Sequence, residues 1–203
     1  MSVRSRDPNP ESTELASGIT VAAYRGMVRL GDRAGIADLI QKRFEERYLS
    51  PVLDSRAPHG FAMLAICCLM VEALESFRQG WASTENKHGG EPFCAFFQAH
   101  AGFSDLRPVA HEFYRAVRCG ILHQAETTHG WRVNRDPGQL LEMSGDVRWV
   151  SAWEFAQRLC GALRAYCSEL KDLDWDAPTW KKARRKLQTI CKNCGVVDVA
   201  GLA

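Results

Sequence analysis

The sequence lacks an apolar run long enough to cross a membrane. Its longest apolar stretch covers residues 61–71 (FAMLAICCLMV), well short of the roughly 20 residues that a transmembrane helix needs. Residues 1–17 also contain no apolar run, so we expect no signal peptide there. Both absences favour a cytoplasmic protein with no membrane partner, in which residues 61–71 belong to a buried core helix.

Net charge is also low, and disulfides are not expected. Lys and Arg number 26 and Asp and Glu 24, so the formal net charge is +2 at pH 7, too weak to predict general nucleic-acid binding. A small basic cleft needs only a few local charges and stays compatible with this value.

Without an export signal, the eight cysteines are expected to be free thiols. Cys191 and Cys194 have zinc-pair spacing, but no second such pair exists, so we expect no metal.

The hydrophobic pattern predicts a mainly α fold, a helical bundle with a small β-hairpin insertion. We expect residues 131–133 and 147–150 to be the two strands of that hairpin. Residues 1–17, rich in Ser, Pro, Arg and Glu, are expected to form a disordered arm before a single domain at residues 18–203. The predicted helices cover residues 37–49, 58–80, 91–100, 108–126, 151–170 and 178–191.

Several helix boundaries carry capping residues. Ser151 and Glu154 fit a capping box at the start of one helix. Gly80 is placed to end the apolar helix. Pro108 and Pro178 are placed in first turns, where the missing N–H of proline is harmless.

The helix at residues 108–126 carries the most chemistry. Phe113, Val117 and Ile121 share one face on a helical wheel, which predicts the core side. Gly120 lies beside them and destabilises a helix interior, so we expect a close helix–helix contact there. Arginine suits phosphate, and histidine can move protons near neutral pH. The opposite half, with His123 at its edge, carries the following residues: His111, Arg115, Arg118, Cys119, Leu122 and Glu126.

Arg118 and His123 form an Arg-x4-His element. In its context (FYRAVRCGILHQAE at residues 113–126, then Gly130 and Trp131), this element resembles small bacterial HEPN-domain proteins. The preceding apolar helix, ending VEALESF at residues 71–77, resembles the helix before the motif in that family. The resemblance covers roughly residues 57–170, and only the phrase around residues 118–123 is specific. Cys119 departs from the pattern, because many active members carry a polar residue there, often Asn.

The resemblance implies a metal-independent endoribonuclease without a cofactor. The RNA 2′-hydroxyl would attack the adjacent phosphate and leave a 2′,3′-cyclic phosphate. His123 would be the general acid or base, and Arg118 would stabilise charge on the phosphate. The family analogy also implies a nearby acidic residue, for which Glu72 and Glu75 are candidates. The remaining supporting candidates of this site are His111, Arg115 and Cys119.

The resemblance further implies a homodimer. In the family the composite site forms where two motifs meet. Arg118 and His123 stand about 140° apart on the wheel, so one helix aims them imperfectly at a single point. A two-fold partner would ease this mismatch. RNA would be the substrate, and an antitoxin or other regulatory protein would be a partner if the chain is a toxin or phage-defence effector.

Three interpretations stay open. The chain is an enzyme, a non-catalytic HEPN-like module that binds RNA or protein, or a toxin whose activity is masked by an antitoxin. In the purely structural interpretation, Arg118 pairs with Glu72 or Glu75, and His123 is a surface residue. The basic run at residues 181–186 and the tryptophans near the hairpin are better explained as a solvated helix face and as packing residues than as RNA contacts.

Overall fold

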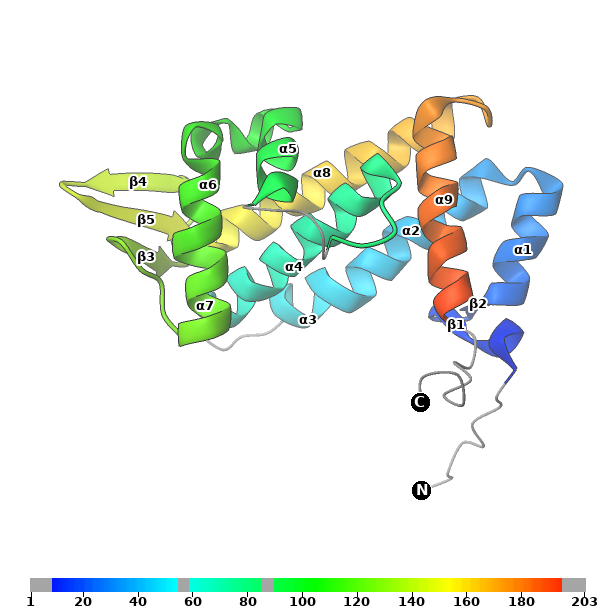
Figure 1. The fold of residues 1–203 in the computed structure, drawn as a ribbon, viewed down its shortest axis with the longest axis horizontal. Coiled ribbons are helices and arrows are strands. Elements are labelled where there is room, and N and C mark those ends of the chain that lie inside the picture. Colours follow the sequence, from blue (N-terminus) through cyan, green and yellow to red (C-terminus); the bar gives the residue numbers. More distant parts are fainter. Residues whose placement is uncertain (1–8, 55–58, 85–89, 195–203) are drawn as a thin grey trace, which may run out of the picture.

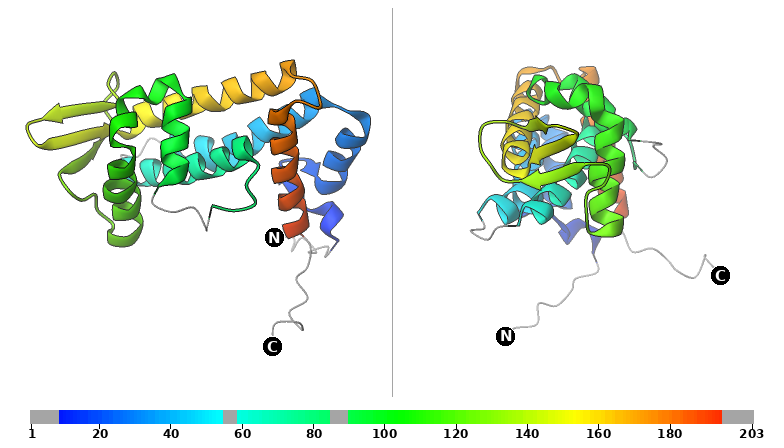
Figure 2. Two further views of the ribbon diagram at one scale, coloured as in Figure 1. Left: turned by 45° about the horizontal axis from the view of Figure 1, so that its top comes forward. Right: turned by 90° about the vertical axis from the view of Figure 1, so that its left-hand side faces the viewer.

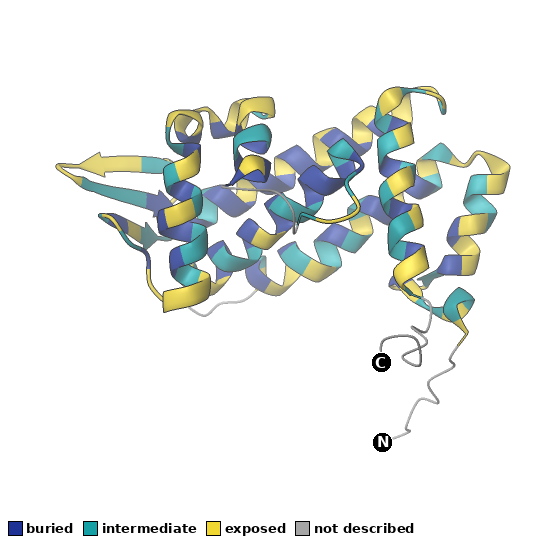
Figure 3. Cartoon of the chain, in the orientation of Figure 1, coloured by how far each residue is buried: buried dark blue, intermediate teal, exposed yellow. Residues whose placement is uncertain are grey.

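The computed structural model describes residues 9–54, 59–84 and 90–194, and it confirms a mainly α fold. Helices α2 (Arg33–Phe44), α4 (Gly60–Gln79) and α8 (Ala152–Asp172) run along the long axis of the molecule (Figure 1). Helix α8 contacts both α2 and α4. The buried sides of these helices face one another, as Figure 3 shows by colour, so the main core lies between them.

Other elements flank these three helices at both ends. Helix α1 (Val21–Leu30) and helix α9 (Pro178–Asn193) lie at one end, and a small sheet with helices α6 and α7 lies at the other (Figures 1 and 2). The other elements are η1 (Pro10–Ser12), β1 (Glu14–Ala16), β2 (Ile19–Thr20), η2 (Glu45–Leu49), α3 (Ser50–Leu53), α5 (Glu91–Ala99), η3 (Ala101–Val109), α6 (Ala110–Phe113), η4 (Tyr114–Arg118), α7 (Cys119–Gln124), β3 (Trp131–Asn134), β4 (Leu141–Ser144) and β5 (Val147–Ser151).

Helix α4 is the core helix that the sequence predicts. By length and composition alone it is the one helix of the described ranges that could cross a membrane. However, 56% of its most apolar window is buried, and it contacts α5, α8 and α9. This is the packing of a core helix. Gly80 ends α4 in the left-handed conformation (φ 69°), as its capping role requires.

The small sheet corrects the predicted hairpin. The sheet has the strand order β3-β5-β4, and the two predicted strands are neighbours in it. They run parallel, with Trp131 opposite Arg148, so they do not form a hairpin. The hairpin is β4–β5, which is antiparallel. Strand β4 has the short sequence LEMS with mostly exposed side chains, and this gives no alternating apolar pattern to detect.

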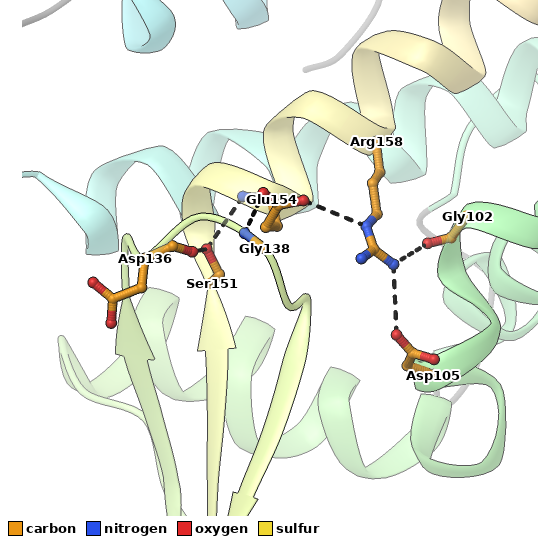
Figure 4. A network of polar contacts seen from close by, with 7 residues as sticks. All are labelled: Gly102, Asp105, Asp136, Gly138, Ser151, Glu154 and Arg158. Atoms are coloured by element: carbon orange, nitrogen blue, oxygen red, sulfur yellow. Dashed lines mark hydrogen bonds and ion pairs between the residues drawn. The ribbon is translucent and has the colours of Figure 1, made fainter.

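A polar network fixes the sheet to α8 (Figure 4). Ser151 caps α8 by accepting a hydrogen bond from the N–H of Glu154, which confirms the predicted helix start. The N–H of Ser151 donates to the carbonyl of Leu140 and not to Glu154, so only half of the predicted capping box forms. The Ser151 hydroxyl also donates to the carbonyl of Asp136 (2.6 Å), and the N–H of Gly138 donates to the Glu154 carboxylate (2.8 Å). The loop before β4 is therefore held at the start of α8. Arg158 extends the network to η3 by donating to the carbonyl of Gly102 (2.8 Å).

The N-terminal segment is more structured than the sequence predicts. Residues 1–8 of the expected arm lie outside the described residues. Within its remainder, Pro10–Ser12 forms a 3-10 turn, and Glu14–Ala16 pairs with β2. Leu15 is buried, because β1 also packs against α2. Helix α1 follows directly, capped by Thr20, and it was not predicted.

The helix that carries Arg118 and His123 begins later than predicted. Pro108 lies inside the 3-10 segment η3, and α-helical geometry starts at Ala110. The five residues of η4 (Tyr114–Arg118) are wound as a π-helix, so the N–H of Cys119 donates to the carbonyl of Tyr114. π-Segments of this kind occur often at functional sites.

Gly120 makes a close contact, but not with another helix. A Cβ on Gly120 would lie 2.5 Å from the carbonyl oxygen of Glu126 and 3.3 Å from the Cα of Thr127. After α7 the chain turns back over the helix through Ala125 (φ 55°), and the N–H of Thr128 donates to the carbonyl of Ala116. The predicted helix–helix contact is therefore wrong, and the returning loop is what requires glycine.

An aromatic cluster fills the space between α5, η3, α6 and α8. Phe113 stacks on Phe155 at 5.5 Å, and Phe97 stacks on Phe103 at 5.4 Å. His100 borders this cluster, with its ring 4.3 Å from that of Phe96. Burial, and then the charge of Arg78, lowers the pKa of His100 to about 4. The neutral imidazole is therefore the form that the fold accommodates.

We expect Gly120→Ala to destabilise the protein by about 1–3 kcal/mol, because the added methyl group overpacks the backbone of the returning loop. Urea unfolding followed by circular dichroism measures this change. Gly161→Ala is the matched control: Gly161 lies in α8 with open space around its Cβ position. There the substitution should stabilise by up to about 1 kcal/mol through helix propensity. Equal effects of the two substitutions would contradict the role of Gly120.

We also expect stability to fall as the pH drops from about 6.5 towards 4. The unfolded chain takes up a proton on His100 near pH 6.5, whereas the folded protein does so only near pH 4. The contribution of His100 is therefore fully present above pH 6.5 and is lost over this window. Urea unfolding at a series of pH values should show a shallower loss for His100→Asn. His129→Asn, at an exposed histidine with φ 53°, should keep the wild-type slope.

Candidate functional site

Arg118 is held by Glu72 in a two-bond ion pair that joins the motif helix to α4. The Nε of Arg118 donates to Oε1 of Glu72 (2.9 Å), and Nη2 donates to Oε2 (3.4 Å). The two side chains are only 19% and 15% exposed. Such a fork-to-fork pair fixes the guanidinium plane as well as its position. Nη1 takes no part in the pair.

The pair also stabilises the charged form of Arg118. Burial alone would lower the pKa of Arg118, but the hydrogen bonds and the negative charge of Glu72 outweigh it. The pKa of Arg118 is therefore raised above its ordinary value, and the guanidinium is charged at any physiological pH.

Tyr114 supports Arg118 from one turn earlier on the same helix. The guanidinium carbon of Arg118 lies 5.6 Å from the centre of the Tyr114 ring, within the range of a cation–π contact. Gly90 (φ 85°) packs directly on Tyr114, since a Cβ there would lie 2.8 Å from the Cβ of Tyr114. The loop residue before α5 thus holds the tyrosine in place under the arginine.

Cys119 lies against Tyr114 across the π-segment. Burial raises the pKa of the Tyr114 hydroxyl, and a side-chain hydrogen bond with Cys119 raises it further. The phenol therefore stays protonated. Cys68, one turn before Glu72 on α4, is 1% exposed, and burial raises its pKa well above the ordinary value. Two thiols thus lie beside the ion pair, at least one of them in its neutral form.

His123 is not part of this arrangement within one chain. It lies in the last turn of α7 and is exposed. The residues from Cys119 to Gln124 are α-helical, so His123 stays about 140° around the axis from Arg118. The structure of one chain therefore brings Arg118 and Glu72 together but leaves His123 on a different side of the helix.

Glu75 has partners other than Arg118. It is fully buried, and its carboxylate accepts hydrogen bonds from Arg78 (2.6 Å) and from the amide of Gln79 (2.8 Å). These partners lie three and four residues along α4, so the contacts are local to one helix. Of the two acidic candidates in the sequence, only Glu72 contacts the motif.

His111 and Arg115 lie on another part of the same helix. Both are exposed, and together with Glu112 and His129 they line a shallow depression of about 250 Å³. Arg118 does not line this depression. The predicted supporting residues are therefore divided between two places: Glu72 and Cys119 beside Arg118, and His111 and Arg115 in the depression.

Sequence reasoning missed Tyr114 and Gly90. Tyr114 stands four residues before Arg118, and this spacing places side chains next to each other on a helix, so the contact was detectable. The role of Gly90 could not be detected from the sequence, because it depends on the path of a loop that lies 24 residues before Tyr114. The eight cysteines are all free, as predicted, Cys191 and Cys194 included. Within the described ranges, no group of three His, Cys, Asp or Glu side chains is placed to hold a metal ion.

Comparisons with protein-family models, with curated proteins and with solved structures give no significant match to this chain.

The Glu72–Arg118 pair should show strong energetic coupling. In a double-mutant cycle with Glu72→Gln and Arg118→Gln, we expect a coupling of about 1–3 kcal/mol in urea unfolding, because both groups are largely removed from water. The pair between Glu11 and Arg25, with side chains 37% and 54% exposed, is the matched control and should couple by less than about 1 kcal/mol. Coupling no larger than in the control would show that Glu72 does not hold Arg118.

Proposed function

We propose that this chain is a HEPN-like, metal-independent endoribonuclease that works as a cytoplasmic homodimer, in the role of a toxin or phage-defence effector under the control of a partner protein. The observation that carries the proposal is the Glu72–Arg118 pair. Arg118 is charged, rigidly held and still partly exposed. An arginine with these properties is suited to a phosphate group.

The chemistry needs a phosphate clamp and a proton carrier. Glu72 occupies Nε and Nη2 of Arg118, and Nη1 is the nitrogen that would bind a phosphate oxygen. Charge that develops on the phosphate, as the RNA 2′-hydroxyl attacks it, would be stabilised there. His123 would take the proton of the 2′-hydroxyl or give one to the departing 5′-oxygen. The products would be a 2′,3′-cyclic phosphate and a 5′-hydroxyl.

A second copy of the chain would bring a histidine close to Arg118, which the His123 of the same chain does not do. Apolar side chains adjoin the ion pair on both helices: Leu69 stands three residues before Glu72, and Leu122 stands four residues after Arg118. Both belong to the small set of large apolar side chains exposed in the described structure, as does Phe61, two turns before Leu69 on α4. A two-fold contact over this face would bury these side chains and bring the His123 of one chain closer to the Arg118 of the other.

A non-catalytic HEPN-like module that binds RNA or protein is the second candidate. It is favoured by one observation: Glu72 already compensates the charge of Arg118. In this case the pair would be a structural link between α4 and the motif helix, and His123 would be a surface residue. Cleavage assays separate the two candidates, because only the enzyme yields cyclic phosphate ends.

We expect the purified protein to cleave single-stranded RNA in the presence of EDTA. His123→Ala and Arg118→Ala should each lower the rate by at least about 100-fold, the usual contribution of a general acid–base or charge-stabilising group. Gln124→Ala, next to His123 on the same exposed turn, should keep the wild-type rate. Mass spectrometry of the products should identify 2′,3′-cyclic phosphates. Intact RNA with wild-type protein over a broad substrate panel would favour the binding module.

We further expect the protein to be a dimer in light scattering after size-exclusion chromatography. Leu69→Glu should shift it to monomer and lower RNA cleavage with it, because a charge in the centre of an apolar contact is destabilising. Met143 is 55% exposed and lies on β4, an edge strand of the small sheet and outside the proposed contact, so Met143→Glu should stay dimeric. A monomeric wild type that still cleaves RNA would exclude the composite site.

A further inference from the structure

A depression between α1 and α9 lies far from Arg118. Its volume is about 420 Å³, within the range of small-ligand sites. In Figure 1 these two helices stand at the opposite end of the molecule from α7. This depression belongs neither to the ion-pair site nor to the depression around His111, and it does not depend on the proposed ribonuclease.

The rim of the depression is strongly positive. Arg25 and Arg29 from α1 line it together with Arg184 and Lys192 from α9. Among the described residues that line it, none is acidic. Arg25 has an acidic partner outside the lining, Glu11 at 2.6 Å. A concave site with charges of a single sign concentrates the field and attracts a compact anion.

Arg184 is held ready for a ligand. Its guanidinium carbon lies 4.2 Å from the centre of the Trp175 ring, and its Nη2 donates to the carbonyl of Trp175 (3.2 Å). These contacts fix the plane of the guanidinium before anything binds, which lowers the entropy lost on binding. A fixed guanidinium can bind phosphate oxygens at its edge and stack on a planar ring.

The floor of the depression is apolar. It is formed by Tyr24, Val28 and Cys191, of which Tyr24 and Cys191 are largely buried. Burial raises the pKa of the Cys191 thiol and that of the Tyr24 hydroxyl, so both are uncharged at neutral pH. A ligand that matches this site has several negative charges at one end and a flat or apolar group at the other.

We propose that the depression between α1 and α9 is a binding site for a phosphate ester of the nucleotide type. The phosphates lie among Arg29, Arg184 and Lys192, and the base or sugar covers the apolar floor. A simple carboxylate would satisfy only one of these cations, and inorganic phosphate would leave the floor uncovered.

Calorimetric titration of the full chain with ADP, adenosine and pyrophosphate tests the site. We expect one ADP per chain, with adenosine and pyrophosphate each at least about tenfold weaker. Arg29→Gln and Lys192→Gln, both at exposed positions, should weaken ADP binding about tenfold through lost charge-assisted hydrogen bonds. Lys181→Gln is the matched control, because Lys181 is an exposed cation of α9 that does not line the depression. It should bind ADP like the wild type.

Other results would overturn the proposal. If ADP does not bind at millimolar concentration, the site is not a nucleotide site. If Lys181→Gln weakens ADP as much as Arg29→Gln does, the attraction is a diffuse property of α9. If pyrophosphate binds as tightly as ADP, the apolar floor takes no part in recognition. Loss of RNA cleavage in the Arg118 and His123 variants is independent of all three results, so the two proposals fail separately.

Discussion

Burial of α4 is the constraint on which the rest of the structure depends. Helix α8 packs along one side of it, and α5 and α9 contact it elsewhere. Where α9 crosses the end of α4, a Cβ on Gly80 would lie 3.0 Å from the Cα of Lys182, so glycine permits both the left-handed cap and the close crossing. On α4, Leu69 is exposed, and Glu72, three residues later, is bound by Arg118 of the motif helix.

The Glu72–Arg118 ion pair forms the candidate site where the motif helix packs on α4. Glu72 is the first charged residue of α4, directly after its apolar stretch, and a largely buried carboxylate needs a partner. Arg118 is that partner, and the contact fixes the motif helix on α4. The same contact leaves one edge of a charged guanidinium available beside exposed apolar side chains. Structural support and phosphate binding are therefore compatible roles for one arginine, and the proposed dimer would use both.

Elements with strong local signals were predicted well. The capped helix at Ser151, the apolar helix that ends at Gly80 and the helix opened by Pro178 all occur in the structure. Local pattern was insufficient for the sheet, because β4 has no apolar alternation. The parallel pairing of β3 with β5 requires β4, which lies between them in sequence but pairs on the other side of β5. The N-terminal strand was missed because Leu15 is buried by α2 and not by its own neighbours in sequence.

For the candidate site, the sequence by itself determined which residue types share the motif helix and that Arg118 and His123 point in different directions from it. Helical periodicity is a local property, so these conclusions needed no partner helix. Only the tertiary structure decided that Glu72 and not Glu75 contacts Arg118, that a returning loop requires Gly120, and that cations from α1 and α9 surround one depression. These depend on distances between segments far apart in the chain, which are set by how the helices pack.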